Sequence, residues 1–300
     1  MNRVSRPADA VVIEVTHFTD PGCPWAYSAG PALTTLRWRY GDVLRWTLVT
    51  IGLTEDRKQY ADRGSTPIKA AVGWRTTFAR FGMPFAFTPK DGLSATAPAC
   101  RAIVATRLDA PEQEMAAFRA LQFEQFTTTG VLEDPATLRA ALSTVPALDA
   151  DAIVARIDDL DVVAAYEADR ARARTAAGSP TEFQGRSANS DGAVRYTAPS
   201  LVFDAGGRRL EAGGFQPLEA YDVVVANLDP TLARRAPATD PVDVLAAFPY
   251  PLASAEVAAA MTPHLGQTDL LATETALIAA VGDGRAVRTA AGNGSLWSAA

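Results

Sequence analysis

The fold of this chain is decided by the stretch DPGCPWAY, residues 20–27, which follows the apolar stretch VVIEVTHF of residues 11–18. Residues 11–18 are rich in β-branched side chains and predict a buried strand. The turn composition that follows predicts a chain reversal, and Pro24 takes the first-turn position that proline favours in helices. The helix is expected to end near Tyr40, before a second strand over residues 43–51. Together these elements predict a strand–helix–strand unit.

This turn places Cys23 at the start of the predicted helix. Free backbone N–H groups and the positive end of the helix dipole stabilise an anion there, so the thiol pKa is expected to fall from about 8.5 towards about 3.5–7.5. Because turns of this composition tend to lie at the surface, we interpret Cys23 as an accessible nucleophile rather than a buried apolar residue. Asp20 and Tyr27 are candidates for proton transfer or for hydrogen bonds to the sulfur. Their alternative roles are turn formation for Asp20 and aromatic packing for Tyr27. Trp25 is expected to shape the surface that a substrate meets.

The middle of the chain predicts helices without strands. The predicted helical windows span residues 68–81, 97–108, 112–126, 134–142 and 149–174, and a polar loop follows over residues 178–192. Strand patterns return at residues 200–204 and continue through a Gly-Gly turn to Leu210, which predicts a hairpin before a helix over residues 217–228. The resulting order is strand–helix–strand, a block of helices, then strand–strand–helix.

The last part of the chain predicts a separate unit after a proline-rich linker over residues 230–241. Residues 240–300 predict three helices and a terminal hairpin with an Asn-Gly turn, an order that resembles a winged helix. This segment has six acidic and two basic residues, and its third helix, residues 270–281, has no Lys or Arg to contact phosphates. We therefore expect it to pack on its own chain or on a second subunit rather than on nucleic acid.

Composition excludes several classes of protein. The 300 residues include 28 Lys and Arg against 34 Asp and Glu, a net charge of −6, which argues against a nucleic-acid-binding protein. No apolar stretch reaches the length of a membrane span, and no secretory pattern opens the chain, so we expect a cytoplasmic protein. Two cysteines and two histidines are too few for a disulfide scaffold and argue against a metal site. His17, in the first strand, is expected to be a buried histidine with satisfied hydrogen bonds.

Residues 20–27 resemble the active-site turn of the DsbA-like branch of the thioredoxin superfamily, whose core is usually CPWC. The stretch YTAPSLVF, residues 196–203, is similar to the family's loop in which a cis-proline, here Pro199, faces the cysteine. Residues 208–221 resemble the closing hairpin and helix, so the resemblance covers residues 11–228. It implies an α/β fold, and the predicted units are a thioredoxin-like sheet domain (residues 1–65 and 193–229), an inserted all-helical domain (66–192) and a winged-helix-like C-terminal domain (240–300).

The resemblance implies thiol-disulfide oxidoreductase activity, with Cys23 attacking a disulfide and Thr197, Ala198 and Pro199 binding the substrate. The family's second cysteine is replaced by Ala26. Cys23 can therefore form a mixed disulfide but cannot release its partner by closing its own ring. Turnover then requires a low-molecular-weight thiol as co-substrate, or a second thiol of the chain.

Cys100 is the candidate for that second thiol, because it lies near the start of a helix that borders the active site in related proteins. Arg101 beside it would favour a thiolate if it lay close to Cys23. The alternatives are a packed helix residue for Cys100 and a solvated side chain for Arg101.

Two other functions stay open. The kappa-class glutathione transferases and the 2-hydroxychromene-2-carboxylate isomerases are similar in fold but have serine at the nucleophile position, and Cys23 favours redox chemistry over isomerisation. A non-catalytic binding module that has lost its dithiol is the second alternative. The expected partners are a small thiol or a protein disulfide and, for assembly, a homodimer, with no bound cofactor, metal, nucleic acid or membrane.

Overall fold

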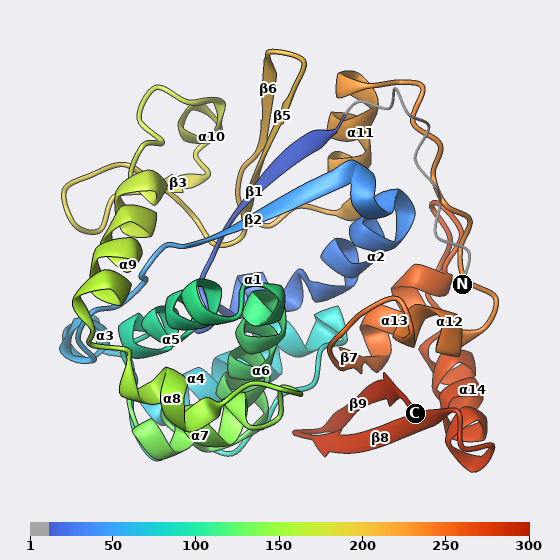
Figure 1. Cartoon of the computed structure of the whole chain (residues 1–300), viewed down its shortest axis with the longest axis horizontal. Coiled ribbons are helices and arrows are strands. Elements are labelled where there is room, and N and C mark those ends of the chain that lie inside the picture. The colour runs from blue at the N-terminus through green and yellow to red at the C-terminus, as the bar shows by residue number, and fades with distance from the viewer. Residues whose placement is uncertain (1–11) are drawn as a thin grey trace.

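A four-stranded sheet lies at the centre of the computed structural model, which describes residues 12–300. Strand β1 (Ile13–Thr19) pairs in parallel with β2 (Leu44–Thr50) and antiparallel with β5 (Ser200–Ala205). Strand β6 (Arg208–Ala212) forms a hairpin with β5, which gives the order β2-β1-β5-β6 (Figure 1). The predicted strand–helix–strand and hairpin units are therefore confirmed, and β1 has a neighbour on each side.

The crossover between β1 and β2 contains two helices where the sequence predicted one. They are α1 (Pro24–Ser28) and α2 (Gly30–Tyr40), and a short 3₁₀ turn, η1 (Gly41–Val43), leads into β2. Pro31 has no N–H to continue the hydrogen bonds of α1, which accounts for the break. Helix α2 and α11 (Leu218–Leu228) cover one face of the sheet.

A helical block is inserted between β2 and β5; in Figure 1 α5 to α8 lie below the sheet, α9 lies to its left and α10 at the upper left. Its elements are α3 (Lys58–Asp62), α4 (Pro67–Gly73), the π-helical turn η2 (Trp74–Phe78), η3 (Ala79–Phe81), α5 (Ala97–Asp109), η4 (Pro111–Gln113), α6 (Glu114–Thr127), α7 (Pro135–Leu142), α8 (Ala150–Ala155), α9 (Leu160–Ala173) and α10 (Pro180–Phe183). The window predicted over residues 149–174 is divided into α8 and α9 by a turn. The predicted loop over residues 178–192 contains α10 and β3 (Ser187–Ala188), which pairs with β4 (Arg195–Tyr196).

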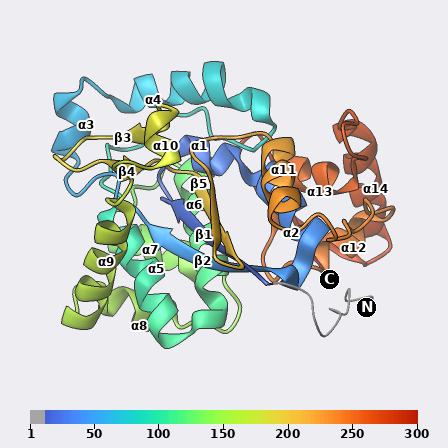
Figure 2. The same ribbon diagram turned by 90° about the horizontal axis from the view of Figure 1, so that it is seen from above.

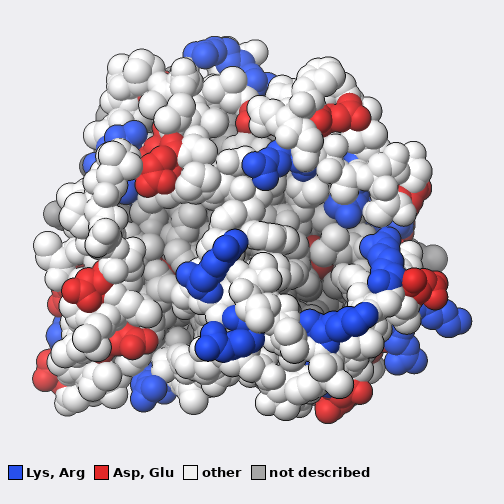
Figure 3. All heavy atoms as spheres, turned by 180° about the vertical axis from the view of Figure 1, so that it is seen from behind, with Lys and Arg blue, Asp and Glu red and all other residues white. Residues whose placement is uncertain are grey.

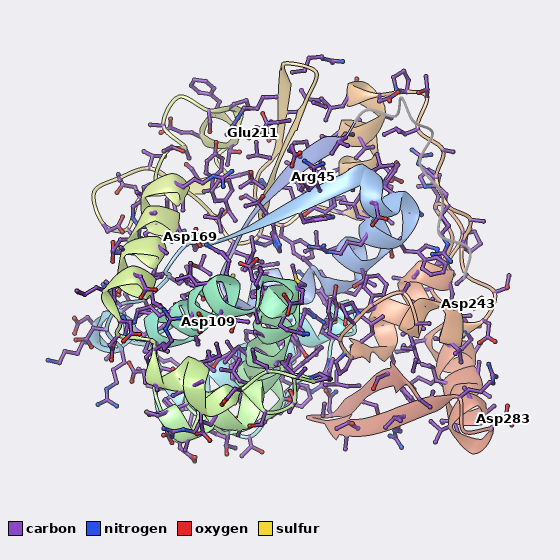
Figure 4. All side chains as sticks on the ribbon, in the orientation of Figure 1. Arg45, Asp109, Asp169, Glu211, Asp243 and Asp283 are labelled. Atoms are coloured by element: carbon purple, nitrogen blue, oxygen red, sulfur yellow. The ribbon has the colours of Figure 1, made fainter. Side chains whose placement is uncertain are left out.

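An ion pair between two helices of this block also hydrogen-bonds to the backbone of β2. Asp169 on α9, labelled in Figure 4, accepts hydrogen bonds from the backbone N–H of Thr50 at 2.9 Å and from Arg107 of α5 at 2.8 and 3.0 Å. Arg107 also donates to the carbonyl of Leu48 at 3.0 Å. These contacts hold α5 and α9 at the end of β2, close to where the chain leaves β1.

The C-terminal segment consists of short elements beside the body, at the lower right of Figure 1. They are α12 (Pro241–Leu245), β7 (Leu252–Ala253), α13 (Ser254–Met261), α14 (Leu270–Gly282), β8 (Ala286–Ala291) and β9 (Gly294–Ala299), and the three strands form a sheet of order β7-β9-β8. Helix α13 packs against α2, and its buried Glu256 accepts hydrogen bonds from Arg119 of α6 at 2.6 Å and from Thr34 of α2 at 3.0 Å. The segment thus packs on its own chain, one of the two arrangements expected.

The β8–β9 turn also contacts the helical block. Asn293 and Phe85 are joined by two hydrogen bonds, of 2.8 Å and 3.0 Å. Gly292 has a φ of +52°, and a Cβ at this position would lie 2.5 Å from the backbone carbon of Phe85. Only glycine therefore fits this turn.

Among the described residues, none of the helices is both long and apolar enough to cross a bilayer.

Candidate functional site

Cys23 lies where β1 ends and α1 begins. It is the N-cap residue of α1, and Pro24 follows in the first helical turn. Its Sγ donates a hydrogen bond of 3.1 Å to the carbonyl of Ala198, 175 residues further along the chain. The Ala198–Pro199 peptide bond is cis, as predicted. The fold therefore brings the cysteine turn and the loop before β5 together.

Cys23 is buried, with only 6% of its surface exposed, so the prediction of an exposed cysteine is wrong. It belongs to an apolar cluster that includes Phe18, Ile51 and Tyr196. Burial raises the pKa of the thiol to about 12, although the backbone amides of Ala26 and Trp25 act to lower it. The predicted lowering of the pKa is wrong because loss of hydration outweighs the helix-end amides in this conformation.

Asp20 stabilises the turn and makes no hydrogen bond to the sulfur of Cys23. Its carboxylate is fully buried and accepts from the N–H groups of Gly22 and Leu53, each at 2.8 Å, and from the hydroxyl of Thr96 at 2.9 Å. Burial raises the pKa of Asp20, and these hydrogen bonds oppose the rise. A Cβ on Gly22 would lie 2.4 Å from the Thr96 methyl group, so a side chain at that position would displace Thr96.

Cys100 is packed beneath this turn. It is fully buried on α5, and its Sγ donates to Asp20 at 3.5 Å, so Asp20 lies between the turn of Cys23 and Cys100. Burial and the Asp20 carboxylate both raise the pKa of Cys100. Both cysteines are free thiols. Arg101 instead pairs with Asp158 at 3.0 Å, so the proposed approach of Arg101 to Cys23 is wrong.

The two aromatic residues of the turn have separate places. Tyr27 is fully buried, and its hydroxyl donates to the carbonyl of Pro84 at 2.8 Å, so the alternative role of aromatic packing applies. Trp25 is 38% exposed and lies against Phe78, Phe81 and Phe215, with ring centroids 4.9, 6.0 and 5.4 Å away. Trp25 thus forms an aromatic surface next to the cysteine in the chain.

The loop that faces Cys23 is held by its own hydrogen bonds. Thr197 donates through its hydroxyl to the carbonyl of Arg186 at 2.7 Å. Ser200, at the start of β5, accepts from the N–H of Gly214 at 2.9 Å. Ala198 is nearly buried and presents its carbonyl oxygen to the thiol of Cys23. The loop therefore holds this carbonyl at the sulfur of Cys23.

Sequence reasoning missed two residues of this site. Arg195 is buried on β4, and its positive charge acts to lower the pKa of Cys23. Tyr60 lies on α3; its pKa is raised to about 12 by burial and, to a smaller extent, by the charges of Asp20 and Cys23. Arg195 stands four residues before Pro199, after the end of the loop predicted over residues 178–192, and its burial left no pattern in the sequence.

His17 is buried but lacks the expected partners. Neither ring nitrogen has a hydrogen-bond partner among the described residues, and burial, with a smaller effect of Arg37, lowers the pKa of His17 to about 3. The ring borders a cavity of about 20 Å³ that Ala26, Gln122 and Glu256 also line. Such a volume has room for about one water molecule. Ala26, which stands where the resemblance would place a second cysteine, thus adjoins this small cavity.

No family model matches the sequence, and no curated protein is similar to it. Solved structures are similar in fold. A proposed protein disulfide isomerase from Nitrosomonas europaea matches at 20% identity and a TM-score of 0.53, over 72% of this chain and 97% of that one. The cytosolic disulfide reductase DsbM from Pseudomonas aeruginosa matches at 17% identity and a TM-score of 0.50, over 72% and 99%.

A probable DsbA oxidoreductase from Streptomyces coelicolor matches at 17% identity and a TM-score of 0.52, over 76% of this chain and 94% of that one. These matches span nearly the whole of each solved structure. The fold of this chain is therefore similar to that of solved disulfide oxidoreductases, including a probable DsbA oxidoreductase.

Proposed function

We propose that the chain is a thiol-disulfide oxidoreductase or thiol transferase that uses the single nucleophile Cys23 and a low-molecular-weight thiol as co-substrate. The observation that carries this proposal is the position of its Sγ, between the first N–H groups of α1 and the carbonyl of Ala198 beside the cis Pro199. The names of the structurally similar proteins, a disulfide reductase and a probable DsbA oxidoreductase, support the same class of reaction.

The proposed reaction has two exchange steps. The thiolate of Cys23 attacks one sulfur of a disulfide, forms a mixed disulfide and releases the other sulfur as a thiolate, which takes up the proton that Cys23 lost. The thiolate of the small thiol then attacks the sulfur of the bound substrate. The new disulfide leaves, and Cys23 regains an electron pair and a proton. Ala26 supplies no internal thiol, so the second step depends on the external one.

Activation of the thiol depends on which backbone groups surround the sulfur. In the free protein the thiol donates to Ala198, and this contact stabilises the neutral form. A substrate N–H that occupied the Ala198 carbonyl would remove this acceptor. The sulfur would then keep the amides of Trp25 and Ala26 and the charge of Arg195, which all lower the pKa of Cys23. Substrate binding and thiol ionisation are coupled in this proposal.

A turnover assay tests the proposal. The protein is mixed with bis(2-hydroxyethyl) disulfide and reduced glutathione, and formation of oxidised glutathione is measured over time. We expect turnover that Cys23→Ser abolishes and that Cys100→Ser retains, since a serine hydroxyl can still donate to Asp20. Turnover that survives Cys23→Ser would assign the reaction to another group.

A non-catalytic module that binds thiol-containing partners is the second candidate. The raised pKa of Cys23 and the absence of a second cysteine in the turn favour it. This candidate predicts saturable binding of the disulfide with no turnover, and equal affinity in Cys23→Ser. The glutathione-dependent isomerase alternative predicts instead a carbon adduct of the thiol without net oxidation.

The remaining assignments are also proposals. We place the protein in the cytoplasm, in line with the cytosolic description of DsbM. The proposed units are those given by the sequence, with residues 240–300 as a winged-helix-like unit that packs on the body rather than binding nucleic acid. A homodimer is compatible with this arrangement, and the apparent mass in solution would test it.

A further inference from the structure

The charge of this chain is unevenly distributed. Residues 57–90 contain seven Lys and Arg against one Asp, a net charge of +6, whereas the whole chain carries −6. This segment runs from α3 through α4 to the loop before α5, and Figure 2 shows α4 on the side of α1 that faces away from β1. This basic segment therefore lies beside α1, the helix that Cys23 caps.

These cations are exposed and largely unpaired. We define the basic rim as Lys58, Arg63, Lys69, Arg75, Arg80 and Arg186, all of which are exposed. Within residues 12–300 none of them has an acidic side chain within salt-bridge distance. Figure 3, seen from behind, shows Lys and Arg side chains gathered in the middle of this face and acidic side chains towards its edge.

Contacts connect the basic rim to the cysteine turn from two sides. Arg80 lies over the ring of Phe81 at 4.9 Å, and Phe81 lies against Trp25. On the other side, Arg186 accepts through its carbonyl the hydrogen bond from Thr197, next to the cis peptide bond. The side chain of Arg186 also lies close to Gly214, since a Cβ at Gly214 would be 3.3 Å from the Cδ of Arg186.

A third connection runs through Tyr60. The charges of Arg63, Asp20 and Cys23 all act on the pKa of Tyr60 on α3, so Tyr60 lies near both the basic rim and the thiol. Cations thus flank Cys23 on α3, on η3 and beside β3. These places lie on three separate elements, and an extended polypeptide is the kind of ligand that can contact separate elements at once.

The same surface presents apolar side chains. Ile68 and Val72 of α4 are 65% and 55% exposed, and Trp25 is 38% exposed beside Phe81 and Phe215. Exposed apolar area next to unpaired cations is typical of a protein-binding surface, and it differs from the mainly polar surface that binds nucleic-acid phosphates.

We propose that the basic rim binds an acidic polypeptide segment and presents its disulfide to Cys23. This inference rests on the proposed function and names its substrate class. The carboxylates of the partner replace the missing acidic partners of the basic rim, and its apolar side chains cover Trp25 and α4. Electrostatic attraction raises the rate of encounter, so the preference for acidic partners is strongest at low ionic strength.

The test uses twelve-residue peptides with one central cysteine, which is linked as a mixed disulfide to 2-nitro-5-thiobenzoate. Cys23 attacks the peptide sulfur, the bond to the nitrothiobenzoate breaks, and the released coloured thiolate is measured; the proton of Cys23 passes to solvent. One peptide has Asp and Glu around the cysteine, and its matched control has Asn and Gln. We expect the acidic peptide to react about tenfold faster at low salt and the ratio to approach one near 1 M salt.

Matched variants locate the effect. Arg75→Gln/Arg80→Gln removes two charges from the basic rim, and Arg208→Gln/Arg288→Gln removes two exposed charges elsewhere, with the same change in net charge. We expect the first pair to lower the acidic-to-neutral ratio at least threefold and the second to keep it. The salt dependence of the unmodified protein tests the proposal even if a variant fails to fold.

Three outcomes overturn the inference. Equal rates for acidic and neutral peptides would remove the substrate class, and an equal preference in a three-residue version would replace the polypeptide by a small anionic thiol. A DNA oligonucleotide and the neutral peptide would each be added as a competitor of the acidic peptide. Stronger competition by the DNA than by the neutral peptide would assign the surface to nucleic acid. Absence of reaction with every peptide, by contrast, would count against the proposed function itself.

Discussion

Alkylation of Cys23 as a function of pH tests the balance between burial and the helix-end amides. Burial raises the pKa of this thiol from 9.0 to about 12. At pH 7 a thiol of pKa 9 is about 1% ionised and one of pKa 12 only about 0.001%, a ratio of about 10³ or about 4 kcal/mol. Because the thiolate is the reactive form, Cys23 should react about a thousandfold more slowly than an unstructured cysteine.

The assay exposes the protein to iodoacetamide between pH 7 and pH 10, quenches samples over time and measures the alkylated fraction of the Cys23 peptide by mass spectrometry. The rate should rise about tenfold for each pH unit across the whole interval, since the folded pKa lies above it. A short unstructured cysteine peptide, as the reference, should level off near pH 9. A Cys23 rate that is already fast and constant at pH 7 would show that the amides of α1 outweigh burial.

Three substitutions extend the account. Ala26→Cys should be tolerated beside the small cavity and should oxidise a test dithiol, measured by loss of free thiol, because the two turn cysteines can then form and transfer a disulfide. Glu256→Gln should lower the free energy of unfolding by about 3 kcal/mol, measured with urea, because it leaves Arg119 buried without its counter-charge. Gly292→Ala should cost about 1–3 kcal/mol through its clash with the Phe85 backbone.

Each substitution has a matched comparison in the same chain. An Ala26→Ser protein should gain no oxidase activity. If the Ala26→Cys protein also showed no oxidase activity, the assigned geometry would be contradicted. Arg285→Gln breaks an exposed pair with Asp240 and should change stability by less than about 1 kcal/mol. Gly284 also has a positive φ, with open space around its Cβ position, so Gly284→Ala should cost less than Gly292→Ala. Equal costs in either comparison would refute the packing argument.

The sheet could be predicted from the sequence because its signals are local. The strand before Cys23, the Gly-Gly hairpin turn and the helix after it are each specified by neighbouring residues, and β1, β5 and β6 form as expected. Pro31 also carried a local signal, since its missing N–H marks the end of α1. The cis bond before Pro199 followed from the family resemblance rather than from composition.

The chemical state of the site could not be predicted in the same way. The pKa of Cys23 depends on apolar residues from β1, β2 and β4 that surround it only in the folded chain. Likewise, Asp20 is occupied by donors from Leu53 and Thr96, which are remote in sequence. A turn sequence shows which groups stand at a helix end, but tertiary packing decides how much water reaches them.

The central claim is that the sulfur of Cys23 exchanges with a disulfide, and the intact mass of the protein tests it most directly. After incubation with bis(2-hydroxyethyl) disulfide near pH 9, the mass should increase by one mercaptoethanol group. Peptide mapping should place that group on Cys23, and reduced glutathione should remove it. No adduct, or an adduct confined to Cys100, would contradict the account.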